Sequence, residues 1–274
     1  MDKKNQAEMS FLEHLEELRW HLVRSFLYIL VFAVLAFVFK DVVFDVILLG
    51  PSDPEFFTNQ FLCRLAERTG MPVLCINQEQ LLLQNIKMTG QFTTHLWISF
   101  LGGVVVAFPL IFWEFWRFIR PALYKEEVQH SQGAIFFASI LFTIGILFAY
   151  YIISPLSVHF LGNYQVSDKV ENIVNLGSYI GTVASIILAS GILFELPMFI
   201  YFMSKVGLVT AESLKKYRRH SFVVTLALAA IITPPDVISQ ILVCLPIILL
   251  YEAGIIIARS VERKKSRELD TLKG

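Results

Sequence analysis

Residues 191–200, GILFELPMFI, place a glutamate and then a proline inside an otherwise apolar run. The run belongs to a longer apolar stretch, Gly177–Met203, which can cross a hydrocarbon core of about 30 Å as a helix. A carboxylate at that depth costs on the order of 3 kcal/mol to insert. Glu195 is therefore predicted to face a protein interior or a wet cavity, either as a structural hydrogen-bond partner of another helix or as a functional group. Pro197 is expected to kink the helix beside it.

The rest of the chain has the composition of an integral membrane protein. Of its 274 residues, 55% are hydrophobic and 17% are charged, and the mean hydropathy of +0.62 exceeds what a soluble domain needs. Lipid offers no partners to unpaired backbone groups, so apolar runs of spanning length are expected to be helices. We predict one all-α membrane domain over residues 1–274 with six transmembrane helices: Leu22–Phe39, Leu96–Trp113, Gly133–Ile153, Gly177–Met203, Phe222–Thr233 and Val237–Ala258.

The basic residues predict the orientation of these spans. Six spans leave both termini on one side, and 18 of the 23 lysines and arginines lie on that side. Basic residues are retained in the cytoplasm, so both termini are expected there. No short apolar segment with a small-residue cleavage site precedes Leu22, so the first span is expected to be retained rather than removed as a signal peptide.

Two spans are shorter than a bilayer requires. Phe222–Thr233 has 12 residues, about 18 Å of helix, before the breaker TPPD, and the sixth span reaches Glu252 after only 15 residues. Either flanking polar side chains reach the interface or the bilayer is locally thinned.

The segments outside the spans have distinct characters. Residues 10–21 carry one apolar stripe and a capping-box pair, Ser10 with Glu13, and are expected to form an interfacial helix that runs into the first span. Residues 259–274 form a basic cytoplasmic tail. Residues 40–91 form a long extracytoplasmic loop, expected to hold short helices rather than another span because of its prolines and glycines.

The three cysteines divide between the last span and this loop. Cys244 is expected to be a small buried hydrophobe. Cys63 and Cys75 face an oxidising compartment in the predicted orientation, which permits a disulfide, but the sequence leaves open whether they are bonded. A metal site is not expected there, because no histidines lie nearby.

The sequence contains no phosphate-binding loop, nucleophile elbow or paired-histidine metal motif, so neither an enzyme nor a cofactor is expected. Acidic positions stand out instead. Glu17 can be explained more simply as part of a solvated helix face. Glu126 with Glu127 can be explained as an acidic pair at a helix N-terminus. Asp236, after two prolines, has the alternative of capping the last helix.

Four separated motifs resemble those of the TatC family, the polytopic core of the twin-arginine protein translocase. They are FLEHLEELR at the N-terminus, FIRPALYKEE after the second span, FELP in the fourth, and TPPDVISQ between the fifth and sixth. The resemblance covers nearly the whole chain, in order and spacing. It implies a bowl-like membrane protein with short fifth and sixth helices in the bacterial inner membrane.

The resemblance also implies a function as a receptor. TatC proteins bind twin-arginine signal peptides of folded precursors at the cytoplasmic face, self-associate, and assemble with TatA- and TatB-type single-span proteins for export driven by the proton-motive force. Membrane lipids are expected partners and nucleic acids are not. The matching signal-peptide positions are Glu17, Arg19, Phe118, Glu126 and Glu127, and the matching positions for partner contact are Glu195, Asp236 and Gln240.

Two features of the sequence depart from the pattern of the TatC family. Residues Pro51–Asn77, with the cysteine pair, are similar to an insertion, and Glu126 beside Glu127 leaves open which carboxylate meets an arginine.

A proton-coupled secondary transporter that uses Glu195 is the alternative function; inverted repeats would favour it, and the sequence shows none. A passive membrane scaffold would have little use for carboxylates at the cytoplasmic rim.

Overall fold

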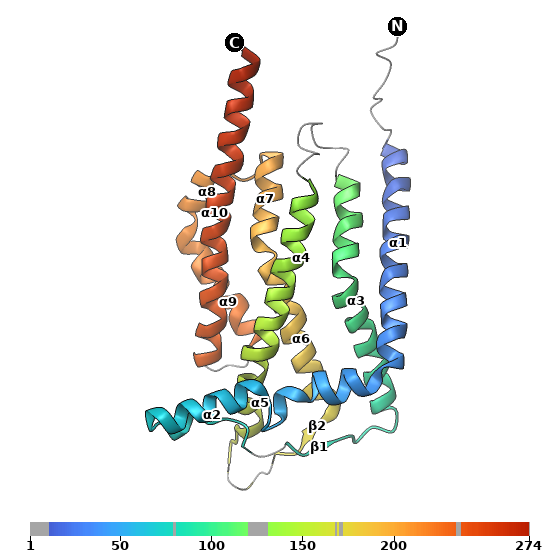
Figure 1. Cartoon of the computed structure of the whole chain (residues 1–274), viewed down its shortest axis with the longest axis vertical. Coiled ribbons are helices and arrows are strands. Elements are labelled where there is room, and N and C mark those ends of the chain that lie inside the picture. Colours follow the sequence, from blue (N-terminus) through green and yellow to red (C-terminus); the bar gives the residue numbers. More distant parts are fainter. Residues whose placement is uncertain are drawn as a thin grey trace. The chain divides into compact units, whose positions relative to one another are not determined.

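The computed structural model describes residues 11–78, 81–119, 131–167, 169, 172–233 and 237–273. The chain forms two compact units, one within Met1–Lys40 and His95–Ser139 and the other within Asp41–Thr94 and Ile140–Gly274. Both are predominantly helical, as expected (Figure 1). Within the described residues, five helical stretches are long and apolar enough to cross a membrane: Leu15–Val38, Gly90–Phe118, Gly133–Asn163, Leu176–Val206 and Ser239–Lys264.

The first unit is built on α1 (Phe11–Val38) and on α3 (Gly90–Ile119) from His95 onward. A Cβ at Gly103 would lie 2.6 Å from the Ile29 carbonyl oxygen, so the two backbones are in direct contact there. The His95 ring stacks on Phe37 with 4.0 Å between ring centroids. Higher numbers on α3 face lower numbers on α1, so the two helices are antiparallel, packed through a small residue as membrane helices often are.

The expected N-terminal helix and first span form one continuous helix. Residues 11–21 are the first turns of α1, without a break before the apolar part. Ser10, the expected cap, lies outside the described residues.

The third span, which belongs to the second unit from Ile140 onward, is longer than predicted. The helix begins as α4 (Ser131–Phe148), passes through the π-helical segment η6 (Ala149–Ile153) and continues as α5 (Ser154–Asn163). Pro155 stands in the first turn of α5, where its missing N–H is tolerated. The sequence pattern placed the end at Ile153 because polar residues begin there, but the helix runs on for ten residues.

The fourth span is interrupted where the sequence predicted a kink. Helix α6 (Leu176–Phe194) ends directly before Glu195, and α7 (Leu196–Val206) begins directly after it. Pro197 lies in the first turn of α7. Its ring removes one N–H and would clash with the carbonyl of Leu193, four residues earlier, so the break falls before the proline rather than at it.

The two C-terminal helices differ in length. Helix α9 (Arg218–Ile232) has 15 residues, about 22 Å, and is short as expected. Helix α10 (Val237–Lys273) has 37 residues and includes the apolar stretch Ser239–Lys264, so the expectation of a short sixth helix is wrong, and the expected basic tail continues this helix. Glu252, within this stretch, forms an ion pair with Arg218 of α9. The pairing compensates for a charge that would otherwise face lipid alone.

Glu262 of α10 also connects to the segment before α9. It accepts a hydrogen bond of 2.7 Å from the backbone N–H of Ala211. Ala211 begins α8 (Ala211–Lys216), which Thr210 and Ser213 cap reciprocally.

The core of the second unit lies among its long helices. One buried cluster joins η6, α6, α9 and α10, and it includes Cys244, as expected. A second cluster packs α7 and α8 against α10. The members are, in the first, Ala149, Ile153, Ile186, Ala229, Val243, Cys244 and Ile247, and in the second, Ile200, Ala211, Tyr251, Ile255 and Ala258.

Residues 40–91 hold short elements rather than a further span, as the sequence predicted. The elements are η1 (Val42–Leu48), η2 (Gly50–Ser52), α2 (Phe57–Thr69), η3 (Pro72–Leu74) and the strand β1 (Leu83–Gln84). The strand pairs in parallel with β2 (Val174–Asn175), which precedes α6. These two-residue strands are the described exception to an otherwise helical fold, and the hydrophobic pattern gave no sign of them.

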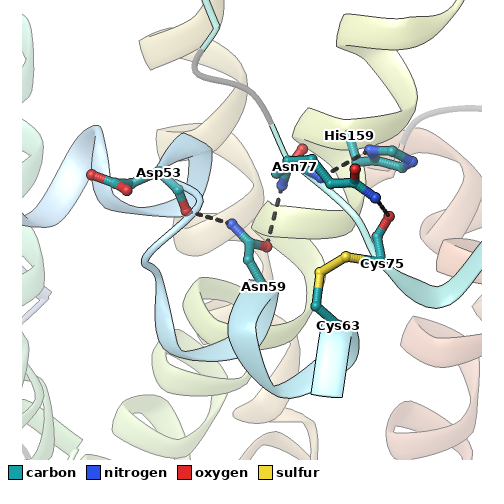
Figure 2. Close-up of a disulfide and its surroundings, with 7 residues drawn as sticks. Asp53, Asn59, Cys63, Cys75, Asn77 and His159 are labelled. Carbon is teal, nitrogen blue, oxygen red and sulfur yellow. Dashed lines mark hydrogen bonds between the residues drawn. A yellow bond between two sulfur atoms is a disulfide. The ribbon is translucent and has the colours of Figure 1, made fainter. Parts of the chain in front are cut away.

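A disulfide joins Cys63 of α2 to Cys75 (Figure 2). Beside it, the Asn77 side chain donates to the carbonyls of Pro155 and Pro51, at 3.1 and 3.3 Å, and to the Asn59 side chain, at 3.3 Å. Asn77 has a φ of +50°, in the left-handed region that asparagine tolerates. The segment between α1 and α3 is thus fixed to itself covalently and to the start of α5 by a buried amide.

We expect loss of the disulfide to loosen this segment without unfolding the bundle. The bridge spans a sequence separation of 12, and closing a loop of that size is worth about 3 kcal/mol in the chain-entropy model. In Cys63→Ser with Cys75→Ser, amide hydrogen exchange should accelerate in α2 and remain unchanged in α10. Cys244→Ser is the matched control. Labelling of both Cys63 and Cys75 by a thiol reagent in unreduced, denatured wild type would contradict the bond.

Candidate functional site

One face of α1 and the C-terminal part of α3 enclose an open pocket in the first unit. Its volume is about 370 Å³, and its lining residues are Glu17, Trp20, His21, Arg24 and Arg117. The four residues from α1 recur at helical spacing, which places them on one side of the helix. Arg117 comes from the last turn of α3. Antiparallel packing therefore brings the beginning of α1 and the end of α3 to the same pocket.

The buried carboxylate of Glu114 organises the charges beside this pocket. Its side chain is 2% exposed. His21 Nδ1 lies 2.5 Å from Glu114 Oε2, and the Arg24 and Arg117 guanidinium groups lie 3.6 and 3.8 Å from the carboxylate. Three basic side chains thus compensate for the removal of one carboxylate from water.

Glu17 is only partly engaged by this network. Its Oε1 lies 3.9 Å from His21 Nε2, and its Oε2 is buried without a hydrogen-bond partner among the described residues. An ionised carboxylate can accept several hydrogen bonds and can bind a guanidinium in a bidentate manner. Glu17 can therefore accept a cationic donor that enters the pocket.

The other predicted signal-peptide residues divide around this pocket. The Phe118 ring lies edge-on to His21 with 6.2 Å between centroids. Arg19 instead pairs with Glu16 at 3.4 Å and lies over Trp20, so it lies outside the lining of the pocket. Glu126 and Glu127 lie outside the described residues.

Glu195, in the second unit, is a second carboxylate that lacks a partner. It occupies the single residue between α6 and α7, near the Phe142 backbone of α4. Both carboxylate oxygens are buried, and neither has a hydrogen-bond partner among the described residues by distance and angle. The interaction with the Phe142 backbone keeps the structural alternative, a hydrogen bond from a neighbouring helix to Glu195, beside the functional one.

The helices around Glu195 approach closely through glycines. A Cβ at Gly145 of α4 would lie 2.8 Å from Cβ of Phe194, and one at Gly191 of α6 would lie 2.8 Å from the Phe142 ring. Both contacts lie before Glu195 in the sequence, where the last two turns of α6 pack closely against α4. The site has no space for a bulkier side chain, while the carboxylate retains its hydrogen-bonding capacity.

The remaining predicted partner-contact residues are not assembled with Glu195 in the described structure. Gln240 of α10 donates to the Leu226 carbonyl of α9 at 3.3 Å, which is a structural contact between two helices. Asp236 lies outside the described residues.

Sequence reasoning missed the network around Glu114. A weak signal was present: FWEFW places Glu114 at the end of an apolar run, and Glu17, His21 and Arg24 share one helical face. The partners lie 93 residues apart in sequence, so only the antiparallel register of α1 and α3 makes them neighbours.

Comparison with protein families gives one match over most of the chain. Residues 13–246 match the family of the Sec-independent protein translocase protein TatC. The chain is 39% identical to the TatC protein of Blattabacterium sp. from Periplaneta americana, over 96% of this chain and 100% of that one. It is 32% identical to the TatC protein of Aquifex aeolicus, over 94% of this chain and 98% of that one.

Solved structures give the same similarity. Two crystal structures of the twin arginine translocase receptor TatC align with TM-scores of 0.66 and 0.70, at 30% and 32% sequence identity. The alignments cover 91% and 90% of this chain, and 100% and 99% of the solved chains.

We expect Glu114→Ala to destabilise the first unit far more than removal of an exposed carboxylate. The substitution leaves His21, Arg24 and Arg117 without their shared counter-charge, and breaking a buried ion pair in this way costs about 3 kcal/mol or more. Glu16→Ala is the matched control, because Glu16 is exposed and its pair with Arg19 is worth about 1 kcal/mol or less. Thermal unfolding in detergent measures both, and equal stability losses would show that the Glu114 network contributes nothing specific.

Proposed function

Because the chain belongs to the TatC family of Sec-independent protein translocase proteins, we propose that it binds twin-arginine signal peptides of folded precursor proteins. It acts as a receptor in a multi-pass membrane protein complex, without an enzymatic step of its own. One observation carries the proposal: a carboxylate with hydrogen-bonding capacity to spare, Glu17, lines an open pocket. At Glu17, the negative charge of the pocket is complementary to the positive charge of the peptide's arginine pair.

The division of charges around the pocket supports this assignment. Arg24 and Arg117 would repel an incoming arginine if they were unpaired, but both lie within 4 Å of the Glu114 carboxylate. Glu114 thus engages the resident cations, and Glu17 is left for the ligand. Glu127, which follows α3 in the sequence, is the proposed second carboxylate, with Glu126 beside it as an alternative.

Two carboxylates suit two adjacent guanidinium groups. Each arginine can form a planar, bidentate pair with one carboxylate, and a lysine cannot reproduce this geometry. Trp20 lies at the pocket with half of its surface exposed. An aromatic face at that position can also attract a guanidinium through its π electrons.

The proposed site lies on the cytoplasmic side. The N-terminal end of α1 and the C-terminal end of α3 meet at the pocket, and the distribution of basic residues assigns both to the cytoplasm. Precursors bind there before export across a bacterial inner membrane, so the receptor would meet them on the side where they are synthesised.

Glu195 has a different role in this proposal. Its unpartnered carboxylate, at a break between two helix halves, is available to a polar group on a single-span TatA- or TatB-type helix. Such a pairing within the membrane would satisfy both groups where water is absent. Assembly with these partners and with further copies of the chain would then follow precursor binding, with the proton-motive force driving transport.

Arginine recognition can be measured by a double-mutant cycle between the receptor and the peptide. We expect Glu127→Lys to weaken signal-peptide binding strongly, and Glu17→Gln or Glu127→Gln to weaken it about fivefold, which corresponds to about 1 kcal/mol. A peptide with both arginines replaced by lysine should bind less well, and should lose most of the difference between wild type and each glutamine variant. For each receptor variant, titration of the two labelled peptides against purified wild type and variant gives the four affinities of one cycle.

The control is Glu16→Gln, which removes an exposed carboxylate on the same helix turn and should show no coupling. The coupling at Glu17 should also decrease as salt rises, because the contact is accessible to ions. Purely additive effects at both Glu17 and Glu127 would show that neither carboxylate contacts the arginines of the signal peptide.

The role of Glu195 can be separated from peptide binding. We expect Glu195→Ala to leave signal-peptide affinity within twofold of wild type and to abolish most export, because the residue serves partner contact. Crosslinking of precursor and export assays on the same variant measure both. Equal losses of binding and export would contradict the assignment. Ligand uptake by the purified chain alone, abolished by Glu195→Ala, would favour the proton-coupled transporter instead.

A further inference from the structure

Within the second unit, one face of helix α2 is packed against its neighbours, and another face exposes large apolar side chains. Asn59 and Ala66 are buried, at 1% and 5% exposure. Phe57, Phe61 and Leu65 are exposed, at 71%, 56% and 37%. The exposed residues are spaced at four, so they form one stripe along the helix.

The exposed stripe cannot turn inward, because α2 is held on its other side. The Asn59 amide donates to the Asp53 carbonyl at 2.7 Å, and the disulfide fixes Cys63 one turn later (Figure 2). The Thr58 hydroxyl donates to the Tyr151 carbonyl at 2.5 Å. The structure therefore presents the apolar stripe in a fixed orientation.

This stripe is continuous with the surface of a membrane-spanning helix. The Phe57 ring meets Tyr151 edge-on, 6.3 Å between centroids, and Phe56 stacks on the same ring at 5.6 Å. Tyr151 belongs to the apolar stretch Gly133–Asn163 and is itself 40% exposed. Tyrosine and other aromatic rings are enriched at the membrane–water interface.

The direction and length of α2 suit a helix that lies in the interface. Within the second unit it runs across the direction of α6 and α10 (Figure 1). With 13 residues, about 20 Å, it is too short to span a bilayer. A short amphipathic helix that is parallel to the membrane surface can insert its apolar face among the acyl chains.

Two arginines accompany the apolar stripe. Arg64 and Arg68 are exposed, one and two turns beyond Phe61 on neighbouring faces of the helix. Their alkyl chains can cover apolar surface while the guanidinium groups reach lipid phosphates. Charge complementarity therefore favours a phospholipid surface over a purely apolar partner.

We propose that α2 is an interfacial helix whose stripe of Phe57, Phe61 and Leu65 inserts into the extracytoplasmic leaflet, with Arg64 and Arg68 on phospholipid phosphates. This surface anchors the segment that the disulfide closes. It is separate from signal-peptide binding and from partner contact by Glu195, so its test does not depend on either.

The test uses a photo-reactive benzoyl-phenylalanine in the full chain, reconstituted in vesicles of phosphatidylcholine and phosphatidylglycerol. With the probe at Phe61, the chief crosslinked product should be phospholipid, at least fivefold more than with the probe at Glu67. Glu67 is the matched control, because it is exposed on the same helix and lies on the polar side. Arg64→Gln with Arg68→Gln should reduce the share of phosphatidylglycerol in the product at least twofold.

Comparable lipid labelling at Phe61 and Glu67 would overturn the proposal. A crosslinked second copy of the chain as the chief product at Phe61 would also overturn it, since the stripe would then be a protein interface. If thiol labelling shows that the Phe61 variant lacks its disulfide, the same probe at Leu65 reports on the same stripe.

Discussion

A charged side chain removed from water must find a partner within the protein, and this constraint governs both parts of the chain. In the first unit Glu114 meets it with His21, Arg24 and Arg117. These contacts require α1 and α3 to be antiparallel and in one register, which the contact of Gly103 with the Ile29 backbone also requires. Packing and charge pairing thus specify the same arrangement, and the pocket beside Glu17 follows from it.

The second unit leaves the constraint unmet at one position. Glu195 is buried without a hydrogen-bond partner among the described residues, at the point where Pro197 prevents α6 from continuing. Natural proteins retain such a group where it serves function, because a neutral apolar residue would cost less. Gly145 and Gly191 allow α4 and α6 to pack closely just before it, so the surrounding packing does not depend on the carboxylate. Under the proposed function, stability and partner contact would therefore rest on different residues.

The sequence predicts what depends on run length and local chemistry. Apolar runs located the long helices, Pro197 located the break in the fourth span, and the prolines and glycines between Lys40 and Gln91 excluded a further span there. What the sequence did not predict depends on distant residues meeting. The Glu114 network needs the register of α1 and α3. The sequence named Cys63 and Cys75 as a possible pair, but whether they bond depends on the path of α2. The helix beyond Ile153 was missed because polarity marks the end of a membrane run and not the end of a helix.

The segment of residues 40–91 differs physically from the spans. Within the membrane, each helix satisfies its own backbone and lipid covers its surface. The helices of residues 40–91 are short, and a short helix is marginal in water. The segment instead relies on a covalent closure between Cys63 and Cys75 and on Asn77, whose amide group joins two carbonyls and a second asparagine. Because these bonds restrict α2 on one side only, the opposite face is left to be stabilised by whatever surrounds it, and its aromatic rings continue directly from the span at Tyr151. Under the proposed insertion of α2, the hydrocarbon boundary that shapes the spans would extend along this helix as well.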